Sequence, residues 1–231
     1  MKKDELDFLI KFLVESDAIE GIGNDYDKVR EDFLNADIGD LNALKGHVGA
    51  LMFLRKLANK NVAHKMDEKL VRRTQRLIVQ EQPQKGEREL PPSQRGHWRQ
   101  HDVVLVRTNR HGEILSRRPI GAEYVKISER MSELLKDVNE WLSVKCKSQT
   151  IEEKIRFIAR FHWIYEQRIH PFDDGNGRSG RALVYFLYRC LNLEPFVFTY
   201  LDKHIDYYPC FVDDDSELME RYFLDRSSAA N

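Results

Sequence analysis

A short stretch of the chain, residues 168–181 (RIHPFDDGNGRSGR), combines side chains that could bind a phosphorylated ligand. Gly175 and Gly177 leave main-chain N–H groups open to a ligand, and the N-terminus of a following helix attracts anions. Arg178 and Arg181 are three residues apart, so they share one helical face where their guanidinium groups could hold phosphate oxygens. These residue types predict a phosphate-binding loop.

Two further side chains of the same stretch could supply catalytic chemistry. Asp174 offers a hard oxygen ligand of the kind that binds Mg²⁺ together with phosphates and water. His170 is the side chain of this stretch that can accept a proton near neutral pH. The combination predicts phosphoryl or nucleotidyl transfer to a hydroxyl group.

Two helices must position this loop. Apolar residues recur at close to helical spacing over 151–167, just before the loop. A second apolar run covers 182–191, and its helix is expected to begin near Arg178. The loop therefore joins two buried helices.

The loop resembles the signature HxFx[D/E]GNGRxxR of the Fic (filamentation induced by cAMP) proteins. The matching positions are His170, Phe172, Asp174, Gly175, Asn176, Gly177, Arg178 and Arg181. Eight specified positions match by chance with a probability on the order of 10⁻¹⁰ per start site, so the resemblance is specific. It implies a mainly α fold, a helical bundle with a β-hairpin flap over the active site, in which Phe172 anchors the loop in the core.

The activity that the resemblance implies is that of a protein adenylyltransferase, which uses Mg²⁺ and transfers AMP from ATP to a Ser, Thr or Tyr hydroxyl of a protein, itself included. His170 would deprotonate the hydroxyl, and Asp174 would hold Mg²⁺ across the α- and β-phosphates. Asn176 would stabilise charge on the α-phosphate. Arg178 would contact the β-phosphate and Arg181 the γ-phosphate. Relatives with other transfer reactions replace one loop glycine, so the retained pair favours AMP transfer.

A second motif lies near the N-terminus. Residues 16–21 (SDAIEG) resemble the [S/T]xxxE[G/N] inhibitory motif of Fic proteins, in the N-terminal position of the class II members. Ser16 and Glu20 are one helical turn apart, and Gly21 favours a chain reversal. The resemblance implies that Glu20 pairs with Arg181 and keeps ATP in an unproductive pose.

Two other functions stay open from the sequence. Glu20 could position water for the removal of AMP from modified protein, which would make the chain a de-AMPylating or bifunctional enzyme. A nucleotide-binding regulator that catalyses nothing is an alternative of another class. The retained His170 argues against this regulator.

A β-hairpin is expected between the two motifs. Residues 96–99 (GHWR) resemble the G-x-[YW]-R segment that precedes the flap of Fic proteins. The stretches 103–107 and 114–116 flank a turn with Asn109 and Gly112, which predicts a hairpin. By the resemblance, this flap pairs its edge with the target peptide, as in other strand-addition complexes.

Two tyrosines complete the expected nucleotide site. Tyr207 and Tyr208 resemble a pair that the family places near adenine, whereas His204 stands where relatives often carry Arg. The expected ATP contacts are therefore Gly175, Asn176, Gly177, Arg178, Arg181, Tyr207 and Tyr208.

Other periodic apolar stretches predict helices over 3–15, 41–58, 66–80 and 125–145. His47, beside the apolar stripe of 41–58, is expected to be a packed structural histidine. The helix over 66–80 has a basic outer face, which we expect to be solvated rather than bound to nucleic acid. Its basic residues are Lys69, Arg72, Arg73 and Arg76.

The expected domain organisation has three parts: an N-terminal segment with the inhibitory helix (1–40), a Fic domain (41–212), and a C-terminal helix and tail (213–231). The tail begins with three aspartates and ends in Ser-Ala-Ala-Asn, which we expect to fray.

Composition excludes several classes of protein. The 37 Lys and Arg residues nearly cancel 38 Asp and Glu residues, which argues against a generic nucleic-acid or membrane-surface binder. Cys146, Cys190 and Cys210 are widely spaced and predict no disulfide, as in a cytoplasmic protein. There is no run of about 18 apolar residues, so we expect a soluble protein. The sequence leaves the target and the oligomeric state, including a homo-oligomer, open.

Overall fold

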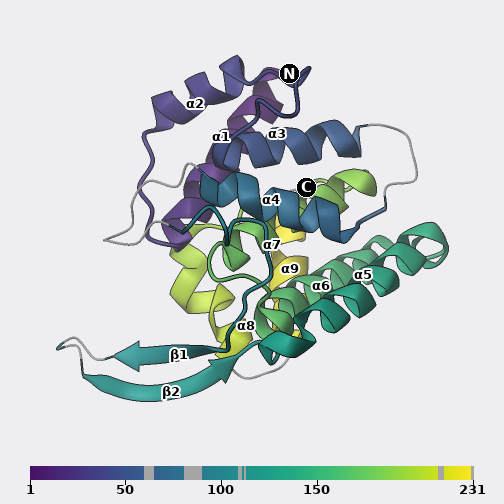
Figure 1. Ribbon diagram of the computed structural model, residues 1–231. Coiled ribbons are helices and arrows are strands. Elements are labelled where there is room, and N and C mark those ends of the chain that lie inside the picture. Colours follow the sequence, from purple (N-terminus) through teal and green to yellow (C-terminus); the bar gives the residue numbers. More distant parts are fainter. Residues whose placement is uncertain (60–64, 81–89, 109–110, 112, 213–215, 230–231) are drawn as a thin grey trace.

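The computed structural model describes the chain except for residues 60–64, 81–89, 109–110, 112, 213–215 and 230–231. Helices dominate the described part, and a two-stranded antiparallel sheet projects from the helical body (Figure 1). The mainly α fold with a β-hairpin is therefore confirmed. The helices of the first half are α1 (Lys3–Ile19), α2 (Tyr26–Asn35), α3 (Gly46–Ala58) and α4 (Glu68–Gln80). Those of the second half are α5 (Ile127–Ser143), α6 (Ile151–Trp163), α7 (Asn176–Cys190), α8 (Pro209–Val212) and α9 (Ser216–Ala229).

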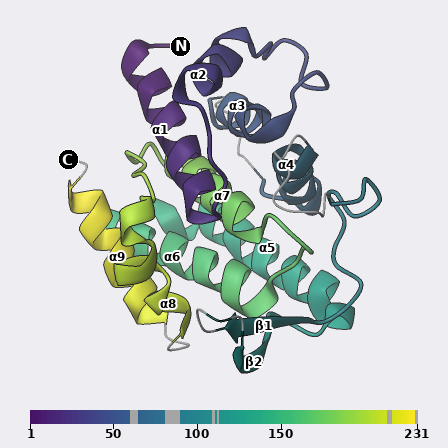
Figure 2. The ribbon, with the colours of Figure 1, turned by 90° about the vertical axis from the view of Figure 1, so that its left-hand side faces the viewer.

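Helix α7 lies at the centre of the body, as Figure 2 shows. Every residue from Arg178 to Tyr188 is buried, because α3, α4, α6 and α1 all pack against this helix. A helix that is covered on every side must bury its polar residues with partners. Arg178 and Arg181, near its N-terminal end, must therefore have polar partners, and these partners define the chemistry of the site.

The helices flanking the loop are firmly bounded. Thr150 caps α6 through reciprocal hydrogen bonds with Glu153, which satisfy N–H groups that the first turn leaves free. α6 then continues as a π-helix, η3 (Ile164–Ile169), which ends at His170. The helix after the loop begins at Asn176, two residues before the expected Arg178.

The other differences from the expected helices concern their ends. The N-terminal helix does not stop at residue 15 but continues to Ile19, so the inhibitory motif forms its last turn. The helix expected over 41–58 begins only at Gly46, which has φ 66°. A left-handed residue cannot extend a right-handed helix, and residues 41–43 form a turn instead.

The C-terminal helix α9 is part of the core. It packs along α6, and both Met219 and Phe223 have no exposed surface. The hydroxyls of Tyr188 and Ser227 are 2.9 Å apart, which ties its last turns to α7. The expectation that this end frays is wrong as far as Ala229, because the apolar face of the helix is covered by α6.

The hairpin consists of β1 (Val103–Thr108) and β2 (Ile114–Ile120). Val103 pairs with Ile120 at the base of the hairpin, and the register is irregular near its tip. The expected turn residues Asn109 and Gly112 both lie outside the described residues, so only the paired strands are confirmed. The hairpin extends away from the helices (Figure 1).

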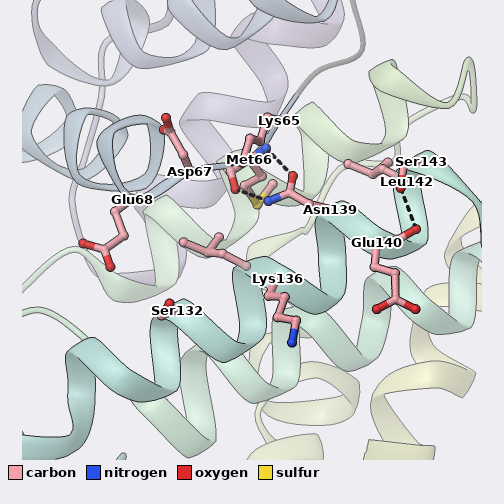
Figure 3. Close-up of a pocket in the computed structure, with 11 residues that line it drawn as sticks. Lys65, Met66, Asp67, Glu68, Ser132, Lys136, Asn139, Glu140, Leu142 and Ser143 are labelled. Atoms are coloured by element: carbon pink, nitrogen blue, oxygen red, sulfur yellow. Dashed lines mark hydrogen bonds between the residues drawn. The ribbon is translucent and has the colours of Figure 1, made fainter.

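A groove of about 860 Å³ lies between the start of α4 and α5 (Figure 3). Asn139 closes one side of it by two hydrogen bonds of 2.8 Å to the backbone of Met66. No residue of the loop 170–181 lines this groove.

In the part of the chain described, no helix is long and apolar enough to span a bilayer.

Candidate functional site

His170 begins the loop in a left-handed conformation, with φ 49°. Its backbone N–H donates to the Tyr165 carbonyl at 2.9 Å, the hydrogen bond of a π-helix. The ring Nδ1 lies 3.0 Å from the Glu166 carbonyl oxygen. A carbonyl oxygen can only accept, so Nδ1 carries the proton and Nε2 keeps the lone pair. The local backbone thus leaves a single nitrogen of this half-buried ring able to accept a proton.

The charge state of His170 suits a base. Burial lowers the pKa of its imidazole, and the charge of Arg99 lowers it further. The bond to the Glu166 carbonyl and the charges of Glu20 and Asp174 act in the opposite direction. Because the net pKa lies below its ordinary value, the ring is neutral at neutral pH.

Arg99, from the GHWR segment, connects the loop to the hairpin. Its side chain is fully buried, and its Nε donates to the His170 carbonyl at 2.8 Å. The same guanidinium donates to the carbonyls of His101 and Ala122, which lie before and after the hairpin. Gly121, with φ 75°, lets the chain pass so closely that a Cβ there would lie 2.6 Å from the Cβ of His170. The hairpin base and the histidine are therefore held as one unit.

Side-chain hydrogen bonds to the backbone hold the middle of the loop in place. The Asn176 side chain accepts from the Phe172 N–H at 2.9 Å and donates to the Phe172 carbonyl at 2.8 Å. Phe172 has no exposed surface, which confirms its expected place in the core. Gln75 of α4 donates to the Asp174 carbonyl at 2.9 Å and accepts from the Gly96 N–H at 2.6 Å. Gln75 is a residue that the sequence analysis missed.

Asp174 presents a partly exposed carboxylate, which could bind a cation together with ligands that the protein does not supply. Its side chain is 45% exposed, and Oδ1 accepts from the Gly175 N–H at 2.6 Å. Arg178 lies 3.5 Å from the same oxygen. Among the described residues, no three His, Cys, Asp or Glu side chains cluster as a metal cage. A single partly exposed carboxylate fits Mg²⁺ bound largely by phosphates and water.

Arg181 is the buried centre of the site. Its guanidinium donates from Nε to the Ser16 hydroxyl at 2.9 Å, and from a terminal nitrogen to the Ser16 carbonyl at 2.9 Å. The same terminal nitrogen donates to Glu20 at 2.8 Å. The other terminal nitrogen lies 3.4 Å from the Tyr207 hydroxyl. Gly21 follows with φ 75° and turns the chain away. The structure therefore brings the two motifs into direct contact.

The Glu20 carboxylate also marks an anion position. A Cβ added to Gly177 would lie 2.3 Å from its Oε1 and 2.9 Å from Arg181. The first turn of α7 has no side-chain cap, and the N–H groups of such a turn attract anions. The chain's own carboxylate thus stands at the helix N-terminus, where the sequence predicts phosphate.

Glu166 is a second carboxylate near Arg181 that the sequence analysis missed. Its Oε1 accepts from the Tyr207 hydroxyl at 3.1 Å and lies 3.1 Å from His162. Burial raises the pKa of Glu166 to about 7, with Arg181 acting against this rise and Glu20 adding to it. The spacing of His162 and Glu166, four residues apart on an apolar helix, is the signal that could have found this pair.

The two expected adenine tyrosines lie in different environments. Tyr207 has no exposed surface, and its hydroxyl also lies 2.7 Å from His162. Tyr208 is half-buried, with Lys203 over its ring at 5.2 Å and the His204 ring 5.7 Å away. Tyr207 thus belongs to the buried network around Arg181, and Tyr208 is the tyrosine of the pair with surface left for a ligand.

Asp17 holds the inhibitory turn from its other side. It lies 2.9 Å from His47 and accepts from Asn24 at 2.8 Å. Both Asp17 and His47 are buried, which confirms the expectation of a packed structural histidine. The charge of His47 lowers the pKa of Asp17 in spite of its burial.

The fold and the loop together define a helical protein with an anion-binding helix N-terminus and a β-hairpin tied to its histidine. The sequence of residues 65–188, more than half of the chain, matches the model of the Fic/DOC family. The chain belongs to this family, and the resemblance that its loop suggests is confirmed.

Solved structures agree on the fold. A Fic domain containing signaling protein from Bacteroides thetaiotaomicron has a TM-score of 0.71 and 20% identity, covering 98% of this chain and 86% of that one. Fic-1 from C. elegans has a TM-score of 0.65 and 19% identity, covering 99% of this chain and 62% of that one. A Fic family protein from Desulfovibrio desulfuricans has a TM-score of 0.59 and 15% identity, covering 98% and 63%. A search of curated proteins finds no significant match.

Proposed function

We propose that the protein is a self-inhibited protein adenylyltransferase, which transfers AMP from ATP to a hydroxyl group of a protein. One observation carries this proposal. His170 presents a neutral ring whose Nε2 keeps its lone pair, in the same loop as an anion position at the N-terminus of α7. A base beside a phosphate cradle is the arrangement that transfer to a hydroxyl requires.

The proposed reaction follows from these positions. Nε2 of His170 takes the proton of the target hydroxyl, whose oxygen attacks the α-phosphorus of ATP. The bond to the bridging oxygen breaks, so AMP stays on the protein and pyrophosphate leaves. Arg178 and Arg181 bind the outer phosphates, and the N–H groups of the first turn of α7 stabilise the charge at phosphorus. Mg²⁺, held on the protein by Asp174, would neutralise phosphate charge.

Self-inhibition is supported by the position of Glu20. Its carboxylate binds Arg181 and occupies the space beside Gly177. A triphosphate bound productively must displace it, because two anions cannot share one guanidinium edge without repulsion. In this proposal residues 1–40 form the inhibitory segment, residues 41–212 the Fic domain, and residues 213–231 a helix that packs on it.

The test uses intact-mass spectrometry with Mg²⁺ and ATP. Glu20→Gly should gain the mass of one or more AMP groups on itself, or transfer the label of α-³²P-ATP to proteins of a lysate. The double variant Glu20→Gly/His170→Ala should do neither. No label on any protein with Glu20→Gly would refute AMP transfer. Release of AMP from modified protein in the absence of ATP would instead identify the hydrolase.

A further inference from the structure

The outward side of α4 carries a cluster of cations that the proposed reaction does not use. Its members are Lys69, Arg72, Arg73 and Arg76, which we call the basic face. Their spacing places them on one side of the helix, and Gln75 of the same helix supports the catalytic loop. They span about 10 Å along the helix axis at 1.5 Å per residue.

Within the described ranges, these four cations lack the carboxylate partners that other arginines have. Among the described residues none of them forms an ion pair with a carboxylate. Other arginines of the chain are paired, such as Arg55 with Glu5 at 2.7 Å. Burial lowers the pKa of Arg73, and the charge of Arg76 lowers it further. Like charges at helical spacing repel each other, so the four cations destabilise α4 unless an anion binds them.

Two of the guanidinium groups are fixed in place. Arg72 donates to the Gly96 carbonyl at 2.7 Å and lies 5.6 Å from the centre of the Trp98 ring. Arg73 lies 4.6 Å from the centre of the Phe53 ring, and its buried Nε has no partner. Side chains held in this way lose little entropy when they bind an anion.

The basic face is hollowed. A cavity of about 500 Å³ is lined by its four cations together with His97 and Arg95, and by one carboxylate, Glu68. A second hollow of about 350 Å³ adjoins it and shares Arg73, Arg76 and Arg95. A ligand seated here would meet several positive charges at once and only one negative charge.

The basic face is connected to the loop 170–181 through the segment that precedes the hairpin. Arg72 binds Gly96 and stacks on Trp98, and Trp98 packs on Phe172 of the loop with ring centres 4.9 Å apart. The described residues 90–102, which include Gly96 and Trp98, lead to the start of β1 (Figure 1). The basic face is thus connected through Trp98 to the loop that carries His170.

We propose that the basic face binds an acidic segment of the protein substrate, next to the part that enters the active site. This inference rests on the proposed function and assigns one determinant of its target. Charge complementarity favours an acidic peptide, since it can place several carboxylates over four cations within about 10 Å. Nucleic acid is disfavoured, because the net charge of the chain is −1 and the basic residues form no extended stripe.

The test compares two synthetic peptides in the Glu20→Gly background. Both contain one serine and a flexible linker of glycines, and they end in six Glu or in six Gln residues. The Glu-tailed peptide should have a KM about tenfold lower with an unchanged kcat. Lys69→Glu/Arg76→Glu should remove this difference, since both side chains are exposed and hold no other part of the structure.

A matched control separates the site from net charge. Lys147→Glu/Arg221→Glu changes two exposed cations elsewhere and should keep the full effect of the acidic tail. Equal KM values for the two peptides, or equal losses in both double variants, would overturn the proposal. Tighter binding of a ten-residue oligothymidine to the same face would also overturn it.

Fluorescence anisotropy with labelled peptides makes the result independent of catalysis. The wild-type chain, without ATP, should bind the Glu-tailed peptide about tenfold more tightly than the Gln-tailed one. Tail-dependent binding without any AMP transfer would support the binding site and defeat the proposed function. Transfer without tail dependence would defeat the binding site and leave the proposed function standing.

Discussion

The contact between Glu20 and Arg181 leads to a graded prediction. Glu20→Gly removes one hydrogen bond of 2.8 Å to a charged group, which is worth about 1.5–3 kcal/mol. The carboxylate is 29% exposed, and solvent screening places the effect near the lower half of that range. About 2 kcal/mol corresponds to roughly a 30-fold rise in the rate of AMP transfer. Glu20→Gln keeps a neutral acceptor and should raise the rate by roughly fivefold, since charge assistance is about half of such a bond.

The same two substitutions at Glu20, which should raise the transfer rate, should lower the stability of the protein. Each change deprives buried Arg181 of its anion, so the melting temperature without ligand should fall from wild type to Gln to Gly. Saturating Mg²⁺ and ATP should restore it, because a phosphate then takes the position of the carboxylate. The rise in melting temperature on adding ATP should therefore be largest for Gly.

Rates are measured as label incorporated from α-³²P-ATP, and melting temperatures by differential scanning fluorimetry. Glu15→Gln is the matched control, because it removes the same charge from α1, the helix that Glu20 caps. Glu15 accepts from the Tyr200 N–H at 2.6 Å and does not contact Arg181 among the described residues. Equal rates for wild type, Gln and Gly would refute the reasoning. So would an ATP-induced rise in melting temperature that is the same in all three.

Three other predictions use residues around the site. Because the pKa of Glu166 is raised to about 7, its carboxyl stabilises wild type below pH 4.5, and this contribution is lost as the pH rises through 7. Glu166→Gln has no such group, so its free energy of unfolding should rise relative to wild type by about 3 kcal/mol between pH 4.5 and 8, at about 1.36 kcal/mol per pKa unit. A difference in urea midpoint that stays constant over this range would contradict it. Asp17→Asn should lower the free energy of unfolding by about 1.5–3 kcal/mol and raise the transfer rate, because it weakens the hydrogen bond between buried Asp17 and His47; an unchanged urea midpoint would count against this. Arg99→Lys should lower kcat by about 10–100-fold and leave the Kd of ATP unchanged, because Lys cannot bridge the His170 and hairpin carbonyls; a parallel loss of ATP affinity would contradict a positioning role.

The catalytic loop could be predicted from the sequence because its chemistry is local. Every residue of the signature lies within twelve positions, from His170 to Arg181, and helical spacing alone places the two arginines on one face. The contact of Glu20 with Arg181 crosses 161 residues. Its expectation came from a family resemblance, since no local pattern encodes a contact of that range.

The residues that the sequence analysis missed are polar groups whose partners are remote. Gln75 meets the Asp174 carbonyl across 99 residues, and Glu166 meets Tyr207 across 41. Periodicity marks which face of a helix is apolar, but it does not say which polar residue on that face will find a partner. The same limit applies to α9, whose apolar residues were visible while the surface of α6 that covers them was not.

In the proposed function, Arg181 accounts for ATP binding and inhibition at one site. A guanidinium without solvent contact is stable only beside an anion, so the resting protein must supply one. Glu20 supplies this anion by direct contact with Arg181, and Glu166 is connected to Arg181 through the Tyr207 hydroxyl. Any ligand that displaces Glu20 must offer this arginine a better acceptor than one partly exposed carboxylate. The proposed triphosphate, which would also contact Arg178 and the first turn of α7, would meet this condition. The need of buried Arg181 for an anion would then both stabilise the resting fold and select the ligand.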